Sequence, residues 1–198
     1  MYKRIHIFLI LLSSLFPVYG LFFLGWSPYA TVLVFWAETV IMFLFFAAQM
    51  IVRIFMRQWV AIAVLFIASQ ATPFIFIHLF LSTLIFGTNV SELGWHEMIY
   101  LITLGLSSVI YGIFIVLIKY ISEFFIFIKN REYTKPLSTR KMEAVSVLFS
   151  RIFTMQFTII FGGAVARLFD NVNLGVSVLV ISQTIFNLYS YFKNSKHV

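Results

Sequence analysis

The sequence predicts an all-α membrane protein with six transmembrane helices, both termini in the cytoplasm and an amphipathic interfacial extension after the fourth helix. Of the 198 residues, 62% are hydrophobic and only 11% are charged, whereas a soluble domain has about 25% charged residues. Long apolar runs recur along the chain, and the basic residues gather between alternate runs. We therefore expect one polytopic domain, residues 1–198, whose solvent is lipid.

The first three helices are predicted at about residues 5–24, 29–52 and 59–86. Lys3 and Arg4 precede the first run as they would in a signal peptide, but no small-residue cleavage site closes it, so we expect a retained helix. Pro28 stands just before the second run, where its missing N–H costs little. The third run is longer than a bilayer core requires, and Pro73 should kink it.

The other three helices are predicted at about residues 98–118, 144–169 and 174–192. Beyond Lys119 the chain stays apolar, but Lys119, Ser122 and Glu123 can share one helical face while Phe124 and Phe125 point elsewhere. This spacing predicts an amphipathic extension that lies in the membrane interface. Aromatic residues near the predicted boundaries, Trp26, Trp59 and Tyr120 among them, are expected to anchor the chain at the interfaces.

The distribution of charge predicts the orientation. All of the 14 Lys and Arg residues except Arg151 and Arg167 lie on one side of the predicted topology, whereas the turns on the other side carry none. The positive-inside rule then places both termini in the cytoplasm, and a bacterial inner membrane is the expected location. The net charge of +7 is explained by contact with anionic lipid, so we do not expect a nucleic-acid partner.

Two ionisable side chains, Glu38 and His78, interrupt apolar runs and are the main candidates for a functional site. By helical rise they lie about 15 Å and about 12 Å below the outer ends of neighbouring antiparallel helices. We therefore expect them to meet in the outer half of the membrane. Thr31 shares the face of Glu38, and Ser82 follows His78 by four residues.

Two interpretations of this pair stay open. It could form a proton-binding or ligand-binding site in a cavity, because histidine titrates near neutrality. Alternatively, it could be a hydrogen-bonded packing element that holds two helices together.

The fifth predicted helix contributes two further candidates, Gln156 and Arg167, which with Gly163 can share one face. They could line a cavity, with Arg167 as the counter-ion of Glu38. Alternatively, Arg167 could extend toward the lipid headgroups, as long basic side chains do near helix ends.

The sequence offers little support for several chemistries. There is no cysteine, and one histidine with one glutamate is too few for zinc, so we expect no metal and no cofactor. Signatures of a P-loop, a dinucleotide site and a nucleophilic serine are absent from the sequence. An enzyme is therefore the less favoured class.

Three segments carry a resemblance: Gly25-Trp26, Phe35-Trp36-Ala37-Glu38 and Phe76-Ile77-His78. Over about residues 15–90 the chain resembles a family of bacterial and archaeal integral membrane proteins catalogued as a domain of unknown function. The family pattern is a Gly-Trp turn, an aromatic-Trp-x-Glu-Asn motif and a histidine in the third helix. Thr39 stands where the family has asparagine. The resemblance implies a multi-pass membrane protein and draws attention to Glu38 and His78, but it implies no activity.

The leading hypothesis is a membrane protein that binds or conducts a small ligand or a proton at the Glu38/His78 site. A second hypothesis is a structural or assembly subunit that packs against another membrane protein or a second copy of the chain. A third is an intramembrane enzyme that acts on lipid with Glu38 as base. The third requires an outer-face cavity that joins Glu38, His78 and another polar group.

Overall fold

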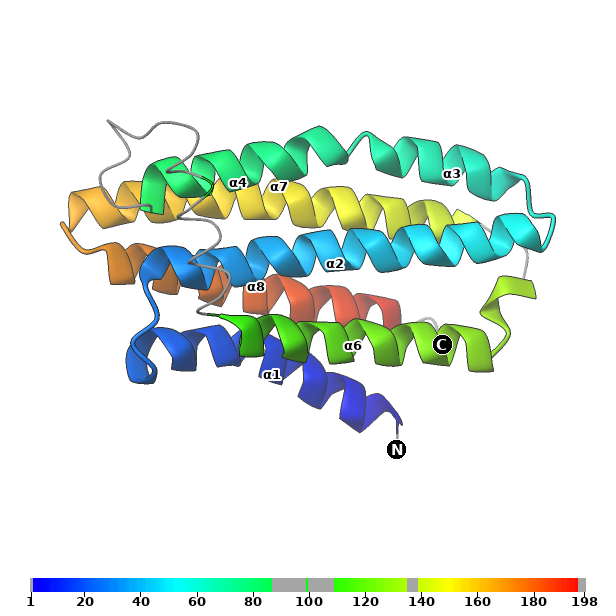
Figure 1. Cartoon of the computed structure of the whole chain (residues 1–198), viewed down its shortest axis with the longest axis horizontal. Helices are drawn as coiled ribbons and strands as arrows, with labels where there is room; N and C mark the ends of the chain where they lie inside the picture. Colours follow the sequence, from blue (N-terminus) through cyan, green and yellow to red (C-terminus); the bar gives the residue numbers. More distant parts are fainter. Residues whose placement is uncertain (1, 87–98, 100–108, 135–138, 196–198) are drawn as a thin grey trace.

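The computed structural model describes residues 2–86, 99, 109–134 and 139–195, and every regular element within them is helical. The long helices lie side by side along the long axis of the molecule (Figure 1). Their bounds are α1 Tyr2–Phe23, α2 Pro28–Phe55, α3 Val60–Ser69, α4 Thr72–Phe86, α6 Ile110–Lys129, α7 Thr139–Leu168 and α8 Val172–Ser195, with a short 3₁₀ helix, η2, at Glu132–Thr134.

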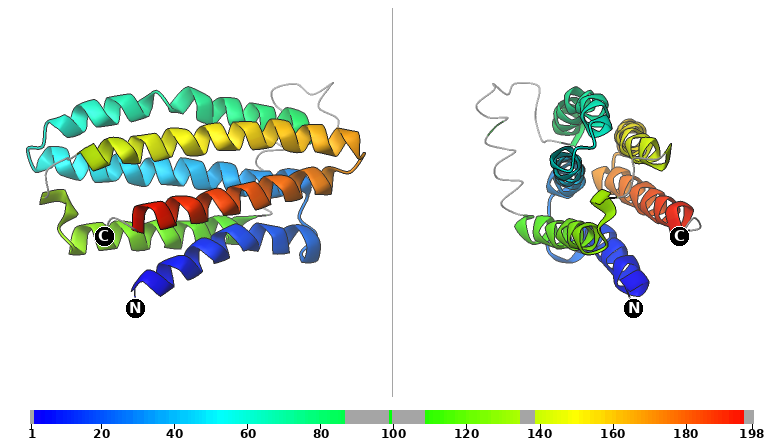
Figure 2. Two further views of the ribbon diagram at one scale, coloured as in Figure 1. Left: turned by 180° about the vertical axis from the view of Figure 1, so that it is seen from behind. Right: turned by 90° about the vertical axis from the view of Figure 1, so that its right-hand side faces the viewer.

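Successive helices alternate in direction when α3 and α4 are taken together (Figure 1). As a result α2 and α6 run parallel to each other. The start of α1 and the end of α8 both point toward the end of the molecule that holds the turn between α2 and α3 (Figure 2).

Helix α2 lies at the centre of this arrangement and contacts α1, α3, α4, α6, α7 and α8. Its first two turns are buried almost without a break, from Tyr29 to Phe35. A helix that is apolar around its whole circumference packs well only when neighbours cover every side. Neighbouring helices therefore enclose the first turns of α2 on every side.

The Gly25-Trp26 turn connects α1 to α2 and packs α1 against the core. Gly25 has a φ of +69°, which a glycine adopts without strain. The turn folds the Trp26 indole onto Gly20, where a Cβ atom would lie 2.3 Å from the ring. Trp26 also packs edge-on against Phe16, with ring centroids 5.6 Å apart. Trp26 is therefore a buried core residue, and the prediction that it anchors the chain at the interface is wrong.

The third apolar run breaks where Pro73 predicts. Helix α3 ends at Ser69, and α4 begins at Thr72 with Pro73 in its first turn. Proline fits the first turn of a helix because its missing N–H would be unpaired there in any case. Just beyond the break, the Trp36 indole donates a 2.9 Å hydrogen bond to the Ile75 carbonyl and ties α2 to α4.

The fourth apolar run differs from the prediction. Helix α6 continues through Lys119 to Lys129 as one element, so no separate interfacial extension begins at residue 119. Lys119 and Tyr120 are buried in the middle of α6, whereas Ser122 and Glu123, on the face that the sequence assigned to the interface, are half-buried. Tyr120 is therefore not an interface anchor. The predicted start of this helix, at about residue 98, lies outside the described residues, as do residues 100–108.

Within the described part of the chain, three helical segments have the length and composition of membrane spans: Pro28–Phe55, Val60–Phe86 and Ile110–Lys129. The outer surface of the described residues carries many exposed large apolar side chains, such as Phe66, Phe76 and Phe157. Such an extended apolar surface is suited to lipid and not to water.

Candidate functional site

The charge of Glu38 is compensated by Lys119. The Nζ atom of Lys119 lies 2.9 Å from Oε1 of Glu38, and the side chains are 5% and 1% exposed. Buried charges in an apolar environment require partners, and this pair provides them. The contact joins the middle of α2 to the middle of α6.

Helical periodicity places both members of the pair on the α2–α6 seam. Glu38 lies four residues after Val34 and three before Ile41, and both pack in the apolar cluster that contains Val116 and Tyr120. Lys119 follows Val116 by three residues and therefore projects from the same face of α6. The pair is enclosed by the apolar side chains that hold the two helices together.

The predicted contact between Glu38 and His78 is not formed. Trp36 hydrogen-bonds to α4, and Glu38 lies about 200° further around α2, on the side away from α4. In the described structure, His78 makes neither a hydrogen bond nor an ion pair with Glu38. The prediction used only the depth of each residue along its own helix. Depth does not specify which side of that helix the residue faces.

His78 has one satisfied and one unsatisfied ring nitrogen. Its Nδ1 atom lies 2.6 Å from the Phe74 carbonyl oxygen. Because a carbonyl can only accept, Nδ1 carries the hydrogen, and Nε2 of the neutral ring is left as an acceptor. Nε2 is buried and has no hydrogen-bond partner among the described residues. The ring also lies near the backbone carbonyl of Ile152 on α7.

Ser82, one turn further along α4, also carries a buried polar atom that lacks a partner within the described structure. Its Oγ atom is buried without a hydrogen-bond partner in the described part of the chain. Residues four apart lie on the same face of a helix. His78 and Ser82 are 1% and 0% exposed, so the inner face of α4 carries two unsatisfied polar atoms.

The remaining candidates are not joined to Glu38. Thr31 is buried, and its hydroxyl donates to the Ser27 carbonyl at 3.2 Å in its own helix. Gln156 is half-buried on α7. Arg167 is exposed in the last turn of α7. The expectation that Arg167 is the counter-ion of Glu38 is corrected, because Lys119 occupies that position.

Sequence reasoning missed the buried role of Arg53, which it counted only among the charges that set orientation. Arg53 is 1% exposed. It donates hydrogen bonds to the Glu132 carbonyl at 2.6 Å and to Gln58 Oε1 at 3.1 Å. Its guanidinium also lies 5.2 Å from the centre of the Phe127 ring. Arg53 therefore attaches the end of α2 to the segment that follows α6.

These observations define a helical protein that has helices of membrane-spanning length and a buried ion pair between two of them. The chain belongs to the family of unknown function DUF6498, whose model matches residues 1–197. The resemblance to an uncharacterised family, first seen over about residues 15–90, is thus confirmed and extends over nearly the whole chain. Comparisons with curated proteins and with solved structures give no match.

Proposed function

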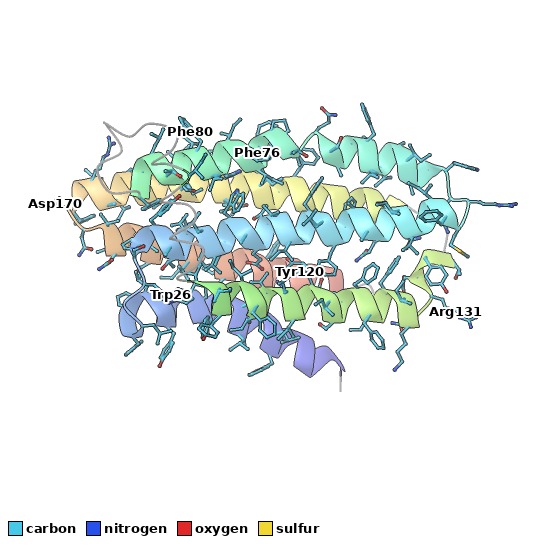
Figure 3. The ribbon with its side chains drawn as sticks, in the orientation of Figure 1. Trp26, Phe76, Phe80, Tyr120, Arg131 and Asp170 are labelled. Carbon is cyan, nitrogen blue, oxygen red and sulfur yellow. The ribbon has the colours of Figure 1, made fainter. Side chains whose placement is uncertain are left out.

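We propose that this protein is a multi-pass protein of a bacterial inner membrane, with six crossings and both termini in the cytoplasm. In this arrangement α3 and α4 together make one crossing. The alternating helix directions and the exposed phenylalanines support the proposal. So does the charge distribution, because the turns after α2 and α6 carry Arg57 and Arg131, whereas the turn at the opposite end carries Asp170 (Figure 3). The positive-inside rule places the turns that carry the arginines in the cytoplasm.

Within that membrane protein, His78 and Ser82 bind a proton or a small hydrogen-bonding solute. The observation that supports this function is the pair of buried polar atoms, His78 Nε2 and Ser82 Oγ, which have no partner among the described residues. Leaving a buried polar group unsatisfied costs about 1–3 kcal/mol. A partner from outside the chain, such as water or a proton held in transit, would remove that cost.

Glu38 has a different role in this proposal. Protonating Glu38 would leave the ammonium group of Lys119 buried without its counter-charge, so the pair stays ionised and neutral overall. The pair holds α2 against α6, as the packing interpretation of Glu38 expects. Binding is therefore assigned to α4, and the intramembrane enzyme is not favoured because Glu38 does not face His78.

Nitrogen NMR of histidine-labelled protein in lipid nanodiscs tests the binding site. The H78Q variant identifies the His78 signals, and F76L, a change at an exposed position of α4, is the control. We expect the Nε2 signal to report a hydrogen bond in wild type and to respond to pH. It should shift in S82A but not in F76L. A free Nε2 signal that is insensitive to pH and to S82A would contradict the proposal.

The alternative of a structural or assembly subunit is supported by the exposed aromatic side chains of the described surface, such as Phe66 and Phe157, because another membrane protein could pack against them. Its partner would be another membrane protein or a second copy of this chain. Mass measurement of the protein extracted from its native membrane separates the two functions. A stoichiometric complex together with a free, unresponsive His78 signal would favour the assembly subunit.

A further inference from the structure

Two turns at the basic end of the molecule place an arginine where helices usually place glycine. Arg57 follows α2 with a φ of 61°, and Arg131 follows α6 with a φ of 51°. The backbone N–H groups of Arg57 and Arg131 donate to the Ile54 and Ile128 carbonyls at 2.9 and 3.0 Å. This left-handed position after a helix favours glycine because a side chain is strained there. An arginine in both turns indicates that the side chains themselves are useful.

The two turns are fixed to each other by side chains from the α2 end. Arg53 donates to the Glu132 carbonyl at 2.6 Å, and Gln58 donates to the Tyr133 carbonyl at 2.7 Å. Gln58 directly follows Arg57, and Glu132 directly follows Arg131. The backbones that carry the two exposed arginines are therefore held next to each other before any ligand arrives.

Both guanidinium groups are available for a ligand. Arg57 and Arg131 are exposed, and neither side chain has an ion pair or hydrogen bond with another described residue. Beside Arg57 stand two apolar side chains, Phe55 at 81% and Trp59 at 67% exposure. This end of the molecule thus combines two exposed cations on adjoining turns with exposed aromatic side chains.

We propose that Arg57 and Arg131 bind the phosphodiester headgroup of an anionic lipid in the cytoplasmic leaflet. A guanidinium group offers paired N–H donors that match two phosphate oxygens. Phe55 and Trp59 would lie against the acyl chains and glycerol region, where aromatic residues accumulate. The inference rests on the proposed membrane topology, which places this end at the anionic cytoplasmic surface.

Native mass spectrometry of the full chain, released from detergent micelles that contain phosphatidylglycerol or phosphatidylcholine, tests this site. The R57Q/R131Q variant removes both guanidinium groups, and R57K/R131K keeps the charge without the paired donors. K3Q/R4Q is the control, because it removes two charges from the N-terminus. Wild type should retain phosphatidylglycerol in preference to phosphatidylcholine. Retention should fall about tenfold in R57Q/R131Q, by a smaller factor in R57K/R131K, and remain in K3Q/R4Q.

Three outcomes would overturn the site. Equal losses in R57Q/R131Q and K3Q/R4Q would show attraction to net charge alone. Displacement of the lipid by millimolar inorganic phosphate would show a site for free anions. No preference for phosphatidylglycerol in wild type would show that the turns bind no headgroup. Thermal melting of each variant shows whether it is folded. A separate cysteine-labelling measurement of topology shows whether a negative result means that the lipid site is absent or that the proposed membrane topology is wrong.

Discussion

Glu38 illustrates, at the scale of a single residue, how far a sequence can specify a buried charge. A lone carboxylate in an apolar helix predicts that a compensating group lies near it. The partner is Lys119, 81 residues later in the chain. No local spacing connects these two residues, because their contact depends on α6 packing parallel to α2. His78 is nearer to Glu38 in the sequence, and its predicted depth in the membrane is similar. It nevertheless faces another part of the protein.

The Glu38–Lys119 pair predicts a specific pattern of stabilities. E38M and K119M should each lower the free energy of unfolding by about 3–5 kcal/mol, because each leaves one buried charge without its partner. The double variant E38M/K119M should lose much less than the sum of the two. Denaturant titration in mixed micelles measures all three, with I118M, at a partly exposed neighbour of Lys119, as control. Additive losses would show that the two side chains do not interact.

At the scale of the helices, α7 and α8 approach closely through glycine. A Cβ atom added to Gly175 would lie 2.3 Å from the Gly162 carbonyl oxygen and 2.8 Å from the Ala166 Cβ atom. The obstacle is backbone, which cannot rotate away as a flexible side chain can. Small residues at such crossings allow close helix packing in membranes.

G175A should therefore separate α7 from α8 and lower stability by about 1–3 kcal/mol. The substitution N173A, at an exposed position of α8, is the matched control and should have little effect. Thermal melting of the two variants in the same detergent measures the difference. If G175A melted at the wild-type temperature, the close approach of the two helices would be refuted.

The elements differ in how well the sequence predicts them. The start of α2 and the break before α4 were predictable, since Pro28 and Pro73 mark them chemically. The C-terminal end of α6 was not predictable. The apolar run continues past Lys119, but the charge of Lys119 was interpreted as the end of the helix. A charge with a buried partner does not end a helix. Likewise, the unsatisfied state of His78 Nε2 depends on the packing of α4 and α7, which no spacing in the sequence encodes.

At the scale of the whole molecule, turns at the two ends of the long axis carry residues of opposite charge, although Arg167 lies in the last turn of α7 near Asp170. Arg131 lies at one end, and Asp170 lies at the other (Figure 3). From the order of apolar runs and basic residues, the sequence predicts that most Lys and Arg residues lie on one side of a membrane. It could not predict that α2 is the central helix, because that position depends on which helices become neighbours.

The measurement that tests the central claim most directly is cysteine labelling from outside the cell. The chain contains no cysteine, so single substitutions N130C and N171C, both at exposed positions at opposite ends, can be labelled without background. If the helices cross the membrane with both termini inside, a membrane-impermeant maleimide labels N171C in intact cells and labels N130C only after permeabilisation. Labelling of both positions in intact cells, or of neither, would contradict a membrane-crossing arrangement of these helices.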